Sequence, residues 1–204
     1  MNSTSGRMSR LDAVTLALIA TGAVSIGFAV LTAAISRVVE IFGSPVALDL
    51  PVHDVPMPGA ADAAGLASAE FTEASASFTQ LDAGIRWLLV GETMLPALST
   101  VLVCATLWWL GFSLIRQRAF RKSMVPVLAT AGLGLIIAGM VGPLLGGIAR
   151  AEAVKALPAP VSDPFWTFLV QLDLSPIGWG IALALVAAAF EVGQRMQKDM
   201  EGLV

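Results

Sequence analysis

The chain has 204 residues, of which 56% are hydrophobic and 13% are charged, and its mean hydropathy is +0.81. Soluble domains carry about 25% charged residues, so this composition indicates an integral membrane protein. The net charge of −3 is small, and the single cysteine, Cys104, excludes an intrachain disulfide and any multi-cysteine metal or iron–sulfur site.

Four apolar stretches are long enough, or nearly so, to cross a hydrocarbon core that needs about 20 residues. The first exceeds the apolar region of a signal peptide and lacks a small-x-small cleavage site, so we expect a span there. We therefore predict an all-α, polytopic membrane protein: one membrane domain built as a four-helix transmembrane bundle. The predicted spans cover residues 13–38, 86–115, 124–149 and 176–193.

Basic residues predict the orientation, because they concentrate on the cytoplasmic side of membrane proteins. With the N-terminus inside, eight Lys and Arg residues fall on the cytoplasmic side and four on the outside. Tyrosine is absent, and Ala, Gly, Val and Leu dominate as in bacterial chains of high-GC coding bias. We expect a multi-pass protein of the bacterial plasma membrane with both termini cytoplasmic. The predicted outer loops are 43–70 and 150–175, the cytoplasmic turn is 116–122 and the cytoplasmic tail is 194–204.

The first outer loop has two parts of different character. The stretch from Ser44 to Gly59 is rich in proline and should be extended or irregular. The following residues place apolar side chains at steps of three and four, which is helical spacing. We therefore predict a helical outer extension of span two that starts near residues 66–70 and is covered by the protein's own loops or by another chain. The apolar positions are Phe71, Ala74, Phe78, Leu81, Ile85 and Leu88.

The second outer loop predicts a short interfacial helix. Asp163 suits an N-cap and Pro164 the first helical position. The apolar residues that follow lie on one side of such a helix, which would rest on the outer leaflet or over the mouth of the bundle. Ser175 and Pro176 start the fourth span by the same logic.

Glu92 is the candidate functional polar site, because an acid within a span is by default a functional hypothesis. Pro96, four residues later, cannot donate to the carbonyl of residue 92, so an unpaired carbonyl and a carboxylate coincide. The functional interpretation is a cation, proton or ligand site. The structural interpretation is that Glu92 pairs with Arg37 or Arg150, or reaches the outer interface.

Catalytic and cofactor motifs are missing from the sequence. It contains no Walker loop, dinucleotide fingerprint, H-E-x-x-H, G-x-S-x-G or histidine pair for haem. One histidine, His53, adjoins Asp54 in a proline-rich segment, which is a poor metal site. We expect no enzyme activity, no cofactor, no metal and no direct binding of nucleic acid.

The cytoplasmic face carries a candidate partner surface. Residues 191–201 can extend the fourth span as a mixed-charge helix that stops at Gly202, and this tail ends beside the basic turn. That turn most readily contacts anionic lipid headgroups, and docking of a cytoplasmic protein is the alternative. The candidate surface consists of Arg116, Arg118, Phe120, Arg121, Asp199 and Glu201.

Two segments carry a family resemblance: the turn Leu114-Ile115-Arg116-Gln117-Arg118-Ala119-Phe120-Arg121 and the tail from Gly193 to Val204. They resemble small four-span bacterial membrane proteins catalogued as a domain of unknown function. That family often has a glycine just before the phenylalanine of the turn, where this chain has Gln117-Arg118. Such proteins are often encoded beside a small helix-turn-helix regulator, so the resemblance implies a membrane-linked regulatory or stress role.

Two functions remain open from the sequence. The first is a regulatory, sensory or accessory subunit that acts through contacts with a membrane or cytoplasmic protein or with further copies of itself. The second is a small-molecule or ion transporter with Glu92 in its pathway. Transport would require the polar residues of span two, Thr93, Ser99 and Thr100, to line one cavity with Glu92.

Overall fold

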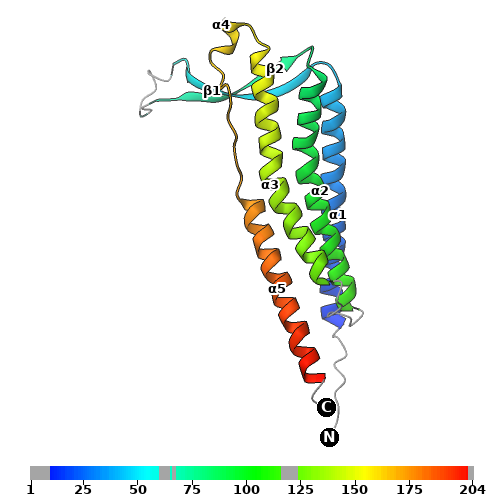
Figure 1. The fold of residues 1–204 in the computed structure, drawn as a ribbon. Helices are drawn as coiled ribbons and strands as arrows, with labels where there is room; N and C mark the ends of the chain where they lie inside the picture. The colour runs from blue at the N-terminus through cyan, green and yellow to red at the C-terminus, as the bar shows by residue number, and fades with distance from the viewer. Residues whose placement is uncertain (1–9, 60–64, 66–67, 116–123, 202–204) are drawn as a thin grey trace. The chain divides into compact units, whose positions relative to one another are not determined.

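The computed structural model describes residues 10–59, 65, 68–115 and 124–201 (Figure 1). Four of its helices are long and a fifth has a single turn. In chain order, two strands come between the first two long helices. The elements are α1 (Arg10–Phe42), β1 (Val46–Pro56), β2 (Glu70–Phe78), α2 (Ala83–Ile115), α3 (Met124–Lys155), α4 (Ala159–Ser162) and α5 (Ser175–Glu201).

The four long helices confirm the predicted all-α, polytopic architecture. Each is long and apolar enough to cross a membrane, and the qualifying segments are Val14–Phe42, Ala83–Ser113, Met124–Lys155 and Ser175–Met196. Large apolar side chains point outward along them, with Leu18 68% exposed and Phe28 70% exposed. Such exposure would be unfavourable in water and is what a lipid environment accommodates.

The chain folds into two compact units. Unit 1 comprises residues 1–34, 95–140 and 173–204, and unit 2 comprises residues 35–94 and 141–172. Unit 1 therefore holds the first part of α1, the second part of α2, the first part of α3 and α5. Unit 2 holds the remaining parts of α1, α2 and α3 together with both strands and α4.

Glycines allow a close helix contact in unit 1, where α3 meets α5. A methyl group built on Gly132 would lie 2.7 Å from the carbonyl oxygen of Gly180, and one built on Gly180 would lie 2.6 Å from that of Gly132. Farther along the same contact, Gly139 faces Pro176. Lipid cannot drive helices together hydrophobically, so the close backbone approach that glycine permits supplies dispersion contacts instead.

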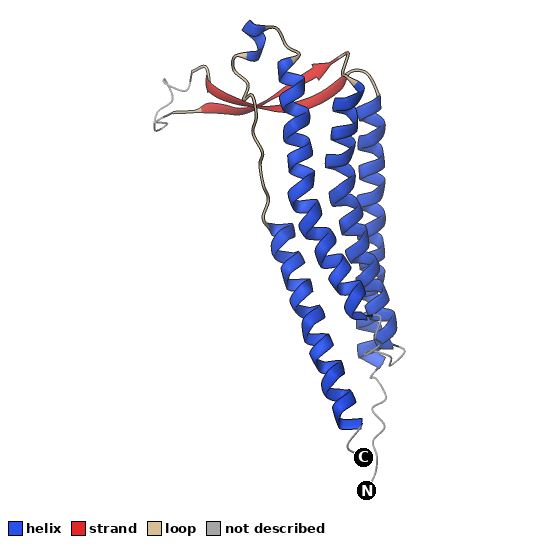
Figure 2. Cartoon of the chain, viewed as in Figure 1, coloured by secondary structure: helices blue, strands red, loops and turns tan. Residues whose placement is uncertain are grey.

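Unit 2 is organised by an antiparallel hairpin of β1 and β2. Val46 lies opposite Phe78 and Pro51 opposite Glu73, and the register shifts between Pro51 and Val55. Alternate residues of β1 point into the core, since Val46, Leu48, Leu50 and Val52 are between 0% and 7% exposed. Val46, Leu48 and Leu50 pack on the ends of three helices, where they join Ile41 of α1, Ile85 and Leu89 of α2, and Ala149, Ala153 and Val154 of α3. Figure 2 shows the strands running across these helices.

The predicted helical outer extension of span two is wrong. Residues Glu70–Phe78 form β2, and α2 begins only at Ala83. The segment that fits helical spacing also alternates over residues 74–78: Ala76 and Phe78 face the hydrophobic core, while Ser77 is exposed. Pairing with β1 satisfies the main chain on one side and so favours the alternating pattern. Asp82 then starts α2, since its Oδ1 accepts from Gly84 N at 2.7 Å.

The predicted interfacial helix after Asp163 is also wrong. A single turn, α4, precedes Asp163, and residues 163–174 are not helical. Their main chain is used elsewhere: His53 N donates to Pro164 O at 2.9 Å, and Trp166 N donates to Pro51 O at 3.0 Å. The segment thus lies beside β1, and its main-chain groups at Pro164 and Trp166 bond to β1 instead of to one another in a helix. The predicted start of the fourth span at Ser175 and Pro176 is confirmed.

Candidate functional site

Glu92 is paired with Arg150 within unit 2. Arg150 Nη1 lies 2.9 Å from Glu92 Oε1, and the two side chains are 32% and 26% exposed. Of the two arginine partners that the sequence suggested, the structure selects the one on α3. The pair is more shielded than a surface ion pair, and it connects α2 to α3.

Arg150 also bonds to the hairpin. Its Nε donates to the main-chain oxygen of Asp49 at 3.2 Å. A planar guanidinium can bind a carboxylate with one edge and a carbonyl with another. One side chain therefore joins α2, α3 and β1.

Gly146 makes room for this arrangement one turn before Arg150. A methyl group built at residue 146 would overlap the Glu92 carboxylate and would lie 2.6 Å from Arg150 Nη1. The glycine therefore supports an ion pair between helices.

Arg37 does not reach Glu92 and performs a similar task on α1. Its Nη1 pairs with Glu40 Oε2 at 3.0 Å, and its Nη2 donates to Ala47 O at 3.1 Å. Arg37 and Arg150 thus hold two alternate carbonyls of β1, those of Ala47 and Asp49.

Arg86 is a third arginine of this kind, and no motif in the sequence indicated its role. Its Nη1 donates to Ile41 O at 2.6 Å and to Gly43 O at 3.0 Å, while Nε donates to Leu81 O at 3.3 Å. It satisfies carbonyls at the end of α1, which helices leave without partners. We call Arg37, Arg86 and Arg150 the arginine clamps.

The polar residues of α2 near Glu92 bond within their own helix. Thr93 Oγ1 donates to Leu89 O at 2.9 Å, and Ser99 and Thr100 both donate to Pro96 O, at 2.8 and 2.9 Å. Helix α2 continues through Pro96. These back-bonds satisfy hydroxyl groups in an apolar environment.

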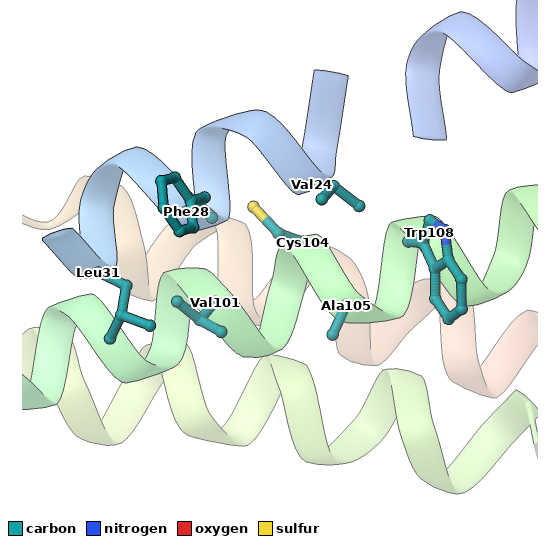
Figure 3. A pocket seen from close by; sticks show the side chains of 8 residues that line it. Val24, Phe28, Leu31, Val101, Cys104, Ala105 and Trp108 are labelled. Carbon is teal, nitrogen blue, oxygen red and sulfur yellow. The ribbon is translucent and has the colours of Figure 1, made fainter. Parts of the chain in front are cut away.

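An apolar groove of about 400 Å³ lies between α1 and α2 in unit 1 (Figure 3). Figure 3 shows the sulfur of Cys104 directed toward α1, beside Val24 and Phe28. Neither Glu92 nor any other charged residue belongs to the lining, so the groove suits hydrocarbon and not an ion. The lining residues are Val24, Gly27, Phe28, Leu31, Val101, Cys104, Ala105 and Trp108.

His53 packs its ring against Trp166, with centroids 5.1 Å apart. Its Nδ1 is buried and has no hydrogen-bond partner in the described part of the chain. Within those same residues, no group of three or more His, Cys, Asp or Glu side chains could hold a metal ion.

The candidate cytoplasmic surface lies largely outside the described residues. This applies to Arg116, Arg118, Phe120 and Arg121 and to the side chains of Asp199 and Glu201. The backbone of α5 does continue to Glu201, as the tail predicted, and Glu191 pairs with Arg195 on it.

Comparison with known proteins returned no matching family model, no matching curated protein and no matching solved structure.

Proposed function

We propose that this chain is a non-enzymatic protein of the bacterial plasma membrane that regulates, senses or assists through protein contacts. In the proposed orientation both termini are cytoplasmic and the hairpin of unit 2 lies outside. The resemblance of the turn and tail to four-span bacterial proteins fits this assignment, and so does the excess of basic residues on the cytoplasmic side.

The observation that supports the proposal best is the use of the arginine clamps. Arg37, Arg86 and Arg150 all donate to main-chain carbonyls, and the carboxylate of Glu92 is paired with one of them. Charged groups near the spans thus serve to fix a hairpin on the helices. A rigid extramembrane element of this kind is suited to presenting a surface.

The alternative of transport through Glu92 draws less support from the same contacts. A transport site needs a carboxylate and hydroxyls that can exchange partners with a substrate. Here Arg150 occupies the Glu92 carboxylate, and the hydroxyl of Thr93 is bonded to its own helix.

The test is to solubilise native membranes gently and identify the proteins that copurify with the full chain. We expect a reproducible partner in fixed stoichiometry, retained in Glu92→Gln, because that variant keeps the shape of the side chain. A matched control is a Leu18→Ala variant, which changes an exposed apolar side chain of α1. A partnerless protein whose substrate flux is lost in Glu92→Gln at normal expression would overturn the proposal.

A further inference from the structure

The two edges of the hairpin differ in their hydrogen bonding. The outer edge of β1 is covered between Ala47 and Pro51: Arg37 donates to Ala47 O and Arg150 to Asp49 O, and Pro51 O accepts from Trp166 N. Exposed strand edges are normally protected in such ways, because their free main-chain groups recruit other strands.

The outer edge of β2 is open. In an antiparallel pair, residues directly opposite each other either bond to one another or both point their main-chain groups away. Since the carbonyls of Ala47 and Asp49 point away from β2, the main-chain groups of their partners Ser77 and Ser75 point away from β1. The same holds for Glu73, opposite Pro51. Among the residues that the structure describes, none bonds to the main chain of these three residues on that side.

The open edge also lacks the proline and lysine residues that commonly protect a strand edge. Residues 70–78 contain no proline and no lysine, and the side chains at 75–77 are serine and alanine. Glu73 has one described side-chain contact, with Gln171 Nε2 at 3.5 Å, and it leaves the main chain free. Small side chains also let another strand approach closely.

We propose that the free edge of β2 binds an extended segment of another protein as an additional strand. The main-chain groups of Glu73, Ser75 and Ser77 would supply the hydrogen bonds, as in other cases of strand addition. This inference rests on the proposed function, since it names the surface and the kind of partner.

The chemistry of the edge specifies the segment. On the exposed face the incoming strand meets Glu73 and the hydroxyls of Ser75 and Ser77, so a lysine or arginine belongs there. On the other face it meets Ala76 and Phe78, which border the hydrophobic core, so small apolar residues belong there. The partner is therefore a strand that alternates apolar residues with polar or basic ones.

The charge of β2 distinguishes this partner from a second copy. Residues 70–78 carry two acidic side chains, those of Glu70 and Glu73, and no basic one. A second copy would bring an edge of like charge, which opposes pairing, whereas a segment with lysine or arginine brings the opposite charge.

The test uses the full chain in nanodiscs and a synthetic peptide in which valine alternates with lysine and threonine. Amide hydrogen exchange of the free protein should be fast at Glu73, Ser75 and Ser77 and slow at Ala74 and Ala76, which bond to β1. The peptide should slow exchange at the three edge residues at least tenfold. A peptide N-methylated at the pairing amides should have no effect.

Two variants complete the test. Ser75→Pro removes an N–H that makes no bond to β1, so the hairpin should persist while peptide affinity falls at least tenfold. Ser75→Thr keeps the N–H and should bind normally. The inference is overturned if the edge amides are already protected in the free protein, if Ser75→Pro binds as well as wild type, or if native mass spectrometry shows homodimers that require this edge. Loss of peptide binding would leave the copurification result of the proposed function unaffected, so the two can fail separately.

Discussion

Removing Arg150 should loosen the hairpin far more than removing an ordinary surface cation. Arg150→Ala breaks the ion pair with Glu92 and the bond to Asp49 O together. Exposed ion pairs contribute about 0.2–1 kcal/mol, whereas breaking a buried pair costs about 3–5 kcal/mol. Since both side chains are about one-third exposed or less, we expect a loss of about 2–3 kcal/mol in the free energy of local opening.

Hydrogen exchange of β1 measures this quantity directly, because local opening limits amide exchange. A loss of about 2–3 kcal/mol corresponds to roughly 30- to 150-fold faster exchange. The matched control is Lys155→Ala, which removes an exposed pair with Glu152 on the same helix and should change exchange less than about threefold. Gly146→Ala should resemble Arg150→Ala, because the added methyl overlaps the Glu92 carboxylate. Equal exchange rates of β1 in Arg150→Ala and Lys155→Ala would refute the role of Arg150 in fixing the hairpin.

Three further predictions concern other parts of the chain. Gly180→Ala should lower the free energy of unfolding of the detergent-solubilised protein by about 1–3 kcal/mol, because its methyl meets a carbonyl of α3. Gly178→Ala, with open space around it, should be neutral or should raise the free energy of unfolding by up to about 1 kcal/mol. Equal effects of the two substitutions would contradict the glycine contact. Arg86→Ala should increase hydrogen exchange in the last turn of α1 by about tenfold, since it removes the donor to Ile41 O, and unchanged exchange there would argue against a capping role. The hydroxyl and N–H of Ser175 bond to Asp173 and hold the pKa of that carboxyl below its ordinary value near 3.8. Because the folded-state pKa is lowered, these bonds stabilise the start of α5 fully at pH values above the ordinary pKa. The stabilisation is lost as pH falls through the lowered pKa. Protection from exchange, relative to the intrinsic rate at each pH, should therefore fall at acid pH in the first turn of α5 in wild type but not in Asp173→Asn, and identical pH profiles would contradict this.

The sequence alone determined the spans and one of the helix starts. Hydrophobicity over about 20 residues is a local property that needs no partner, so all four spans could be predicted. The start of α5 at Ser175 and Pro176 could also be predicted, because a capping residue and a proline act within one helical turn. The first and third helices extend past the predicted ends at residues 38 and 149, to Phe42 and Lys155.

The strands were not determined locally. Residues 70–78 fit both a helical stripe and an alternating strand, since Ala74 and Phe78 satisfy either pattern. Only pairing with β1, whose residues lie 14 to 32 positions away from their partners in the chain, decided between them. Local propensity is a weak preference that such nonlocal pairing overrides.

The candidate site shows the same division. The sequence could name Glu92 as an acid that needs a partner, and it offered Arg37 and Arg150, but the packing of α2 against α3 made the choice. The roles of Arg37 and Arg86 could not be predicted, because their acceptors are main-chain carbonyls, which every residue possesses. Which carbonyl an arginine binds depends on where the fold brings the backbone, and the tertiary structure alone decides that.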